Sequence, residues 1–175
     1  MKSVASAPAK IILFGEHFVV HGTKAILAAI DKRVTVTSSF TENKTIKVNS
    51  QLGTFEVPIS SSYVEVENEF RPFVYLINQC MQMKMFRDVF YRNVNGLEIT
   101  IDSDIPIGVG LGSSSACCVA AAASISELFY TRTTLFGNPQ QTYLAINAEK
   151  TIFPDTSGAD CTVCTYGGMI EYPSI

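Results

Sequence analysis

The stretch between residues 96 and 130 constrains the fold most, because it predicts a strand, a glycine-rich loop and a helix in succession. Residues 96–103 alternate apolar and polar side chains as a half-buried strand does, and an Ala-rich run follows at 116–130. Glycines permit positive φ angles and a close backbone approach to a ligand. Unpaired N–H groups in the first turn of a helix favour an anion. The segment therefore predicts a phosphate-binding loop. The glycines and hydroxyl side chains expected to form it are Gly108, Gly110, Gly112, Ser113, Ser114 and Ser115.

This loop differs from two common nucleotide-binding motifs. It lacks the lysine that G-x-x-x-x-G-K-[ST] places after its last glycine, and residues 108–112 do not fit G-x-G-x-x-G. We therefore expect a nucleotide loop of another kind. A glycine-rich turn before an ordinary buried helix is the alternative.

Composition and charge exclude several classes of partner. The 175 residues suit one domain or most of one, and 47% of them are apolar, which is enough for a sizeable core. A formal net charge of -3 offers no broad attraction for nucleic acid or for an anionic membrane. The start of the chain lacks the apolar segment of a signal peptide, and no run reaches the ~18 apolar residues of a membrane span. We expect a cytoplasmic protein that binds neither nucleic acid nor membrane.

Five cysteines also favour a cytoplasmic protein. Cys161 and Cys164 have the spacing of a metal-binding pair, but no second Cys or His pair stands near them. Cys117 and Cys118 adjoin in the Ala-rich run, where cysteine behaves as a small apolar residue. Free thiols in a reducing compartment are the expected state.

Hydrophobic periodicity predicts an α+β fold with the strands first. Helical spacing and proline positions predict the helices. Residues 161–166 and 169–172, separated by two glycines, predict a final hairpin, and Asp160 is expected to begin its first strand. The predicted strands are 3–14, 17–21, 26–30, 34–40, 45–50, 54–57 and 97–102, and the predicted helices are 69–85, 113–130 and 139–151.

Two further clusters of residues carry possible chemistry. Lys10 lies in an apolar strand and must find an anion, since burying an unpaired ammonium is costly; an edge-strand lysine reaching to solvent is the alternative. Glu16 and His17 follow a glycine and suit a polar substrate. Glu149 and Asp160 flank a turn at Gly158 and suit a Mg²⁺ ligand and a proton acceptor.

Taken together, the three clusters resemble the GHMP small-molecule kinases. The similarity extends over nearly the whole chain and rests on three segments in this order. They are Pro8-Ala-Lys-Ile-Ile-Leu-Phe-Gly-Glu-His-Phe-Val-Val-His-Gly22, Pro106-Ile-Gly-Val-Gly-Leu-Gly-Ser-Ser-Ser-Ala116 and Glu149-Lys-Thr-Ile-Phe-Pro-Asp-Thr-Ser-Gly-Ala-Asp160. The first segment favours the branch of the superfamily that phosphorylates mevalonate, for isoprenoid precursor synthesis. Phosphomevalonate and galactose kinases are the alternatives, as is a non-catalytic binding module of the same family.

The resemblance implies a fold and a set of roles. It implies a mixed sheet packed on helices, like domain 2 of ribosomal protein S5, with ATP and Mg²⁺ as cofactors. A second, ferredoxin-like domain is expected outside this chain, so that residues 1–175 form the N-terminal ATP-binding half and pair with a C-terminal half or a second copy. The roles are proton acceptance by Asp160 assisted by Lys10, phosphate binding by residues 108–115 including Leu111, metal binding by Ser114 and Glu149, and substrate binding by Glu16, His17, Ser157 and Gly158.

Overall fold

The computed structural model describes residues 1–15, 24–59, 66–82, 96–129 and 139–172. The predicted strand at 17–21, like Glu16 and His17, lies outside the described residues. The strands are β1 (Lys2–Phe14), β2 (Ala25–Thr41), β3 (Thr45–Ser50), β4 (Gly53–Pro58), β5 (Gly96–Ser103) and β6 (Met169–Tyr172). The helices are a 3₁₀ turn η2 (Asn68–Phe70) and the α-helices α1 (Arg71–Gln82), α3 (Ser113–Phe129), α4 (Pro139–Lys150) and α5 (Ala159–Tyr166).

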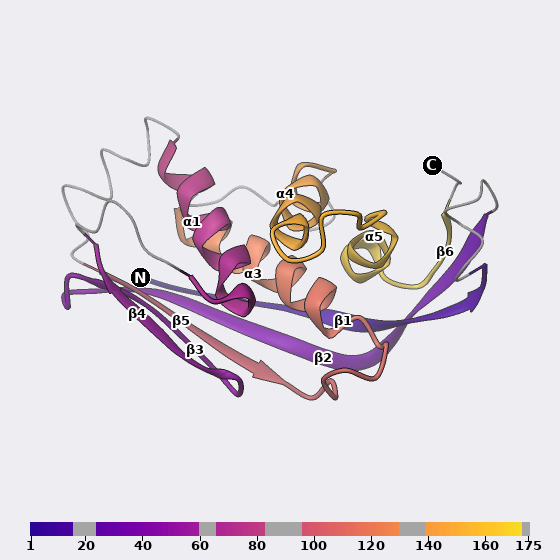
Figure 1. Ribbon diagram of the computed structural model, residues 1–175, viewed down its shortest axis with the longest axis horizontal. Coiled ribbons are helices and arrows are strands. Elements are labelled where there is room, and N and C mark those ends of the chain that lie inside the picture. The colour runs from indigo at the N-terminus through magenta and orange to yellow at the C-terminus, as the bar shows by residue number, and fades with distance from the viewer. Residues whose placement is uncertain (16–23, 60–65, 83–95, 130–138, 173–175) are drawn as a thin grey trace.

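The described strands form one mixed sheet in the order β1-β2-β5-β3-β4, with β6 paired to the start of β2 (Figure 1). Strand β3 runs parallel to β5, and the other pairs are antiparallel. Strand β2 is continuous, whereas the sequence predicted two separate runs. Asp31, Lys32 and Arg33 are exposed where the β1–β2 register shifts, so a bulge rather than a chain break accounts for the polar interruption.

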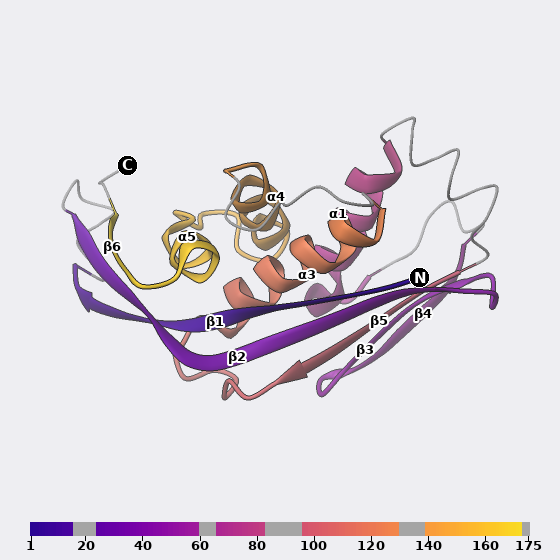
Figure 2. The same cartoon turned by 180° about the vertical axis from the view of Figure 1, so that it is seen from behind.

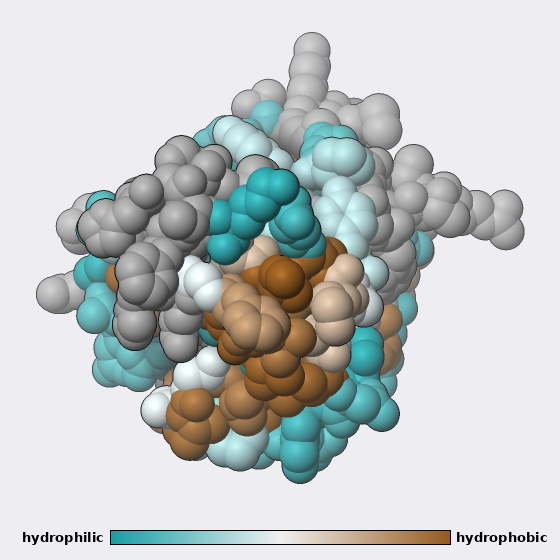
Figure 3. Space-filling view, turned by 90° about the vertical axis from the view of Figure 1, so that its right-hand side faces the viewer, coloured by the Kyte–Doolittle hydropathy of each residue, from teal (hydrophilic) through white to brown (hydrophobic). Residues whose placement is uncertain are grey.

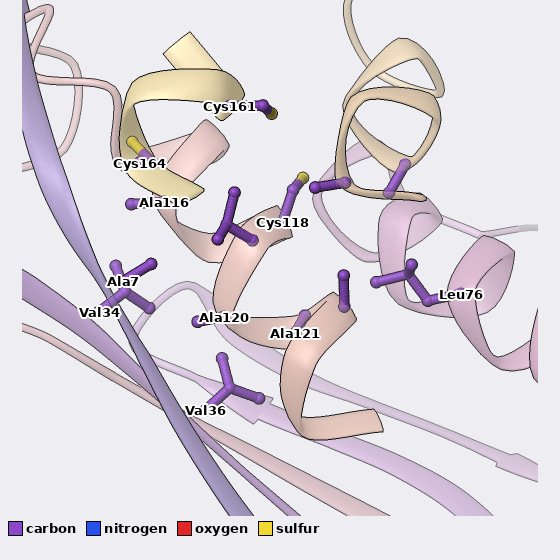
Figure 4. Packing of buried hydrophobic residues seen from close by; sticks show 14 of the residues in the cluster. Ala7, Val34, Val36, Leu76, Ala116, Cys118, Ala120, Ala121, Cys161 and Cys164 are labelled. Atoms are coloured by element: carbon purple, nitrogen blue, oxygen red, sulfur yellow. The ribbon is translucent and has the colours of Figure 1, made fainter. Parts of the chain in front are cut away.

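All four described α-helices cover the same face of this sheet (Figures 1 and 2). Helix α3 lies at the centre, because it contacts β1 and β2 on one side and the other three α-helices on the other. Its Ala-rich sequence is buried almost all round, as expected for a helix enclosed in protein. Figure 4 shows Ala116 and Ala120 toward Val34 and Val36 of β2. The predicted helix at 113–130 is thereby confirmed up to residue 129.

Alternation along the strands matches this one-sided arrangement. In β5, Leu97 and Ile99 are fully buried, whereas Thr100 and Asp102 are exposed. An antiparallel strand with one face on the core and one in water has this pattern. The predictions for β1, β3, β4 and β5 are confirmed to within one or two residues, as are α1 and α4 over their described lengths.

The hairpin predicted at the end of the chain is wrong in its first strand, whereas its second strand, 169–172, is confirmed as β6. Residues 159–166 form helix α5, so Asp160 lies in the first turn of a helix rather than at the start of a strand. Thr162 and Thr165 each donate a side-chain hydrogen bond to the carbonyl four residues earlier, at 2.8 Å, which lets these strand-favouring residues fit the helix. The helix ends at Gly167, with φ of 71°, and β6 then pairs with β2.

Candidate active site

The glycine loop joins β5 to α3, as the sequence predicted, and its three glycines adopt left-handed backbone angles. The φ angles are 78° at Gly108, 78° at Gly110 and 71° at Gly112. A Cβ at Gly108 or Gly110 would meet no heavy atom within 4 Å. Backbone conformation alone therefore explains glycine at these two positions.

Gly112 has a second, steric reason to be glycine. A Cβ built there would lie 2.7 Å from Cγ and 3.0 Å from Cε of Lys10. The backbone N–H of Lys10 also donates to the carbonyl of Leu111, at 3.0 Å. Strand β1 is thus held directly against the loop, and the Lys10 side chain passes Gly112 at close range.

The Lys10 side chain ends in an ion pair with Asp160. Its Nζ lies 2.9 Å from Oδ2, and the side chains of Lys10 and Asp160 are 6% and 30% exposed. The expectation that this lysine finds an anion is confirmed, and the solvent-reaching alternative is wrong. Asp160 stays partly accessible at the first turn of α5, where the partial positive charge of a helix start favours a carboxylate.

The turn before α5 is tightly constrained. Gly158 has φ of 82°, and a Cβ there would lie 2.7 Å from Cδ1 of Ile146 on α4. The phenol of Tyr172 on β6 donates to the carbonyl of Ser157, at 2.7 Å. These contacts place the turn between α4 and β6 and so fix where α5, and with it Asp160, begins.

Glu149 is the buried carboxylate of the site. Only 3% of the residue is exposed, near the end of α4. Ser115 donates its hydroxyl to Oε1, Thr156 donates to Oε2 at 2.8 Å, and the thiol of Cys161 lies 3.5 Å from Oε2. The sequence analysis missed this cluster. Ser115, Thr156 and Cys161 are separated from Glu149 by 34, 7 and 12 positions in the sequence. Such separations form no local motif, so only the fold could reveal the cluster.

A cavity of about 930 Å³ connects these groups. This volume lies in the range of roughly 300–1,000 Å³ typical of small-molecule sites. Its wall combines polar groups with apolar side chains of the β3–β4 turn and of the region where η2 meets α1, among them Leu52, Phe70 and Phe73. The predicted site residues that line it are Lys10, Gly108, Gly110, Gly112, Ser113, Ser114, Ser115, Glu149 and Asp160.

Three predicted site residues within the described ranges do not line this cavity: Leu111, Ser157 and Gly158. Leu111 contributes its carbonyl to Lys10, and Ser157 and Gly158 form the turn before α5.

Within the described ranges, no three or more His, Cys, Asp or Glu residues gather as a metal site. In the same ranges, no helix is both long enough and apolar enough to cross a membrane.

All five cysteines are free, as predicted. Burial raises the pKa of Cys80 and of Cys164 to about 12, and it also raises the pKa values of Cys118 and Cys161 well above 9.0. Thiols with such pKa values remain protonated at neutral pH and are poor nucleophiles. Cys118, Cys161 and Cys164 serve as packing groups of the core around α3 and α5 (Figure 4).

Comparison with known proteins assigns the family. Residues 76–168 match the family model described as the GHMP kinases N terminal domain. The chain belongs to the GHMP kinases. This GHMP kinase chain is 35% identical over 176 residues to the mevalonate kinase of Thermococcus onnurineus, covering 98% of the chain and 52% of that relative. It is 36% identical to the mevalonate kinase of Thermococcus gammatolerans, with the same coverage.

The solved structures agree with this assignment. The mevalonate kinase of Methanococcus jannaschii superposes with a TM-score of 0.79 at 27% identity, covering 99% of this chain and 54% of that one. The α+β fold with a mixed sheet, which the family resemblance implied, is therefore confirmed. The chain spans about half the length of the curated relatives it matches.

Proposed function

We propose that this GHMP kinase chain is the ATP-binding half of an enzyme that transfers the γ-phosphoryl group of ATP to the hydroxyl of mevalonate. The observation that carries the proposal is the Lys10–Asp160 ion pair, whose lysine is buried against Gly112 of the glycine loop and which lines the same cavity as that loop. The relatives named mevalonate kinase, which align with 98% of the chain, support this choice of substrate.

The transfer needs a proton acceptor beside a phosphate-binding loop. The substrate hydroxyl oxygen attacks the γ-phosphorus, the bond from that phosphorus to the bridging oxygen breaks, and ADP leaves with the bonding electrons. Asp160 accepts the hydroxyl proton. The Lys10 ammonium holds Asp160 in place and stabilises negative charge on the moving phosphoryl group.

The loop and the start of α3 bind the ATP phosphates in this proposal. The chemistry of the backbone N–H groups of residues 108–115 and of the Ser113 and Ser114 hydroxyls supports this role. Both kinds of group are neutral hydrogen-bond donors suited to phosphate oxygens. Leu111 takes part through the backbone of the loop, which its carbonyl anchors to Lys10. Ser115 belongs to the same turn, although its hydroxyl donates to Glu149.

The residues present fit a Mg²⁺ ion carried on the phosphates. Mg²⁺ is usually bound through one or two carboxylates together with substrate phosphates and water, not by an all-protein cage. Glu149 and Ser114 both line the cavity and offer oxygen ligands, and we propose them as the protein ligands. When bound, the ion neutralises phosphate charge during the transfer.

Glu16, His17, Ser157 and Gly158 complete the proposal as the mevalonate-binding residues. In the sequence, Glu16 and His17 come directly after Gly15, which itself follows the last residue of the strand that carries Lys10. Ser157 and Gly158 precede Asp160 by two or three residues. Residues so close in sequence to the proton acceptor and its lysine suit a substrate whose hydroxyl must reach Asp160.

The proposal includes a second domain. The relatives are about twice as long as this chain. Figure 3, seen from the end of the molecule where β6 lies, shows apolar side chains gathered on that face. Leu13, Phe14 and Met169 are exposed at 41%, 69% and 68% on β1 and β6. We propose that the part of the relatives not covered here packs on this face.

The five free thiols support a cytoplasmic location.

The test measures ADP release with ATP, Mg²⁺ and mevalonate, using the 175-residue chain alone and mixed with the C-terminal half of a relative. We expect ATP binding by the chain alone and turnover only in the mixture, because an open cleft lacks a preorganised, water-excluding site. Phosphomevalonate and galactose serve as comparison substrates. Absence of ATP binding would refute the proposal, and turnover of galactose but not mevalonate would correct the substrate.

A further inference from the structure

Glu149 ties three segments of the site together. Through its carboxylate it contacts Ser115 at the start of α3, Thr156 in the turn before α5, and Cys161 on α5 next to Asp160. The glycine loop, the turn and the helix of the proposed proton acceptor therefore meet at one buried side chain. The residue is 3% exposed but lines the cavity, so its free acceptor capacity can reach only a ligand inside that cavity.

The two oxygens of the Glu149 carboxylate accept different numbers of hydrogen bonds. A carboxylate has about four lone-pair positions, two on each oxygen. In the described part of the chain, Oε2 receives both the Thr156 hydroxyl and the Cys161 thiol, whereas Oε1 receives only the Ser115 hydroxyl. One position on Oε1 remains, and it is the position that a cation in the cavity would take.

All three partners are neutral donors, and this matters for binding a cation. Lys10, a cationic side chain that also lines the cavity, is engaged with Asp160 instead. A carboxylate held by neutral hydroxyls keeps its whole negative charge available to a metal, whereas a lysine partner would compete with the metal. Hydrogen bonds around a metal ligand orient it and typically change metal affinity by about 10- to 100-fold.

We infer that Ser115 and Thr156 are positioning residues for Glu149, which they hold so that Oε1 presents one open position to a divalent cation on bound ATP. The inference rests on the proposed function, since it takes ATP and its metal as the ligands of the cavity. The inference goes beyond the proposed function because it gives the Ser115 and Thr156 hydroxyls a role that neither phosphate binding nor turn formation requires.

The experiment compares ATP affinity in EDTA with ATP affinity in Mg²⁺, by calorimetry, for the same chain. The ratio of the two dissociation constants reports the contribution of the metal. Thr156→Val and Ser115→Ala remove one donor each, and Thr156→Ser keeps the hydroxyl. Thr165→Val is the matched control, because the Thr165 hydroxyl bonds to the Cys161 carbonyl and not to Glu149.

We expect Thr156→Val and Ser115→Ala to reduce the ratio about tenfold or more, and we expect Thr156→Val to change ATP affinity in EDTA little. Thr156→Ser and Thr165→Val should keep the wild-type ratio. A melting curve of each variant confirms that it is folded, and Ser115→Ala gives an independent reading if Thr156→Val unfolds.

Two results separate the inference from the proposed function. If folded variants keep the wild-type ratio, or if Mg²⁺ does not strengthen ATP binding to the wild type, the positioning role is refuted while ATP binding stands. If the wild-type chain binds ATP under neither condition, the proposed function itself is wrong.

Discussion

The contact between Gly112 and Lys10 gives the sharpest prediction for stability. Gly110 and Gly112 have nearly the same φ angles, 78° and 71°, so an alanine at either position meets the same backbone strain. A left-handed conformation costs an alanine about 1–2 kcal/mol. Only Gly112 has a neighbour in the way, with Cγ of Lys10 2.7 Å from the added Cβ. Overpacking of this kind adds about 1–3 kcal/mol.

We therefore expect Gly110→Ala to lower the free energy of unfolding by about 1–2 kcal/mol, and Gly112→Ala to lower it by about 2–5 kcal/mol. The measurement is urea unfolding followed by far-ultraviolet circular dichroism, because the chain contains no tryptophan. Extrapolation to water at constant slope gives the two free energies.

A double-mutant cycle identifies the cause. Lys10→Ala removes the atoms that the Cβ at position 112 would strike. In that background Gly112→Ala should cost no more than Gly110→Ala, so the two changes should be non-additive. Equal losses for Gly110→Ala and Gly112→Ala in the wild-type background, or full additivity in the cycle, would refute the steric argument.

Three further predictions concern chemistry. Asp160→Asn removes the proposed proton acceptor but keeps the shape, so turnover with the proposed second domain present should fall on the order of 10²-fold or more, with ATP affinity nearly unchanged by calorimetry. Ser114→Ala should weaken Mg²⁺-dependent ATP binding more than Ser113→Ala does; the reverse order would show that the loop register is wrong. The pKa of the Cys80 thiol is about 12 in the folded chain against 9.0 ordinarily, so only the unfolded state loses this proton between these pH values. Stability should fall as pH rises through that range, less steeply in Cys80→Ala, and Ellman's reagent at pH 7.5 should label Cys80 only in denaturant.

The local sequence was sufficient to predict those elements whose conformation depends on interactions between neighbouring residues. The alternation in β5 and the three glycines before a run of small residues predicted the strand, loop and helix, because side-chain period and positive φ depend on few neighbours. The partner of Lys10 was predictable in kind, since a buried ammonium must have an anion. Its identity as Asp160 came from the family resemblance, and the 2.9 Å contact agrees with it.

Tertiary contacts decided the rest. Residues 161–166 have the β-branched composition of a strand, but in the fold the segment is a helix that buries Ala159 with Val163, four residues apart, and Cys161 with Cys164, three residues apart. The hydrogen bonds to Glu149 join residues up to 34 positions apart, and no periodicity encodes them. The sequence by itself therefore identified many of the polar groups that line the cavity, among them Lys10, Glu149 and Asp160. The fold alone decided which of them meet, because a hydrogen bond depends on distances of about 3 Å between atoms that only the packed helices bring together.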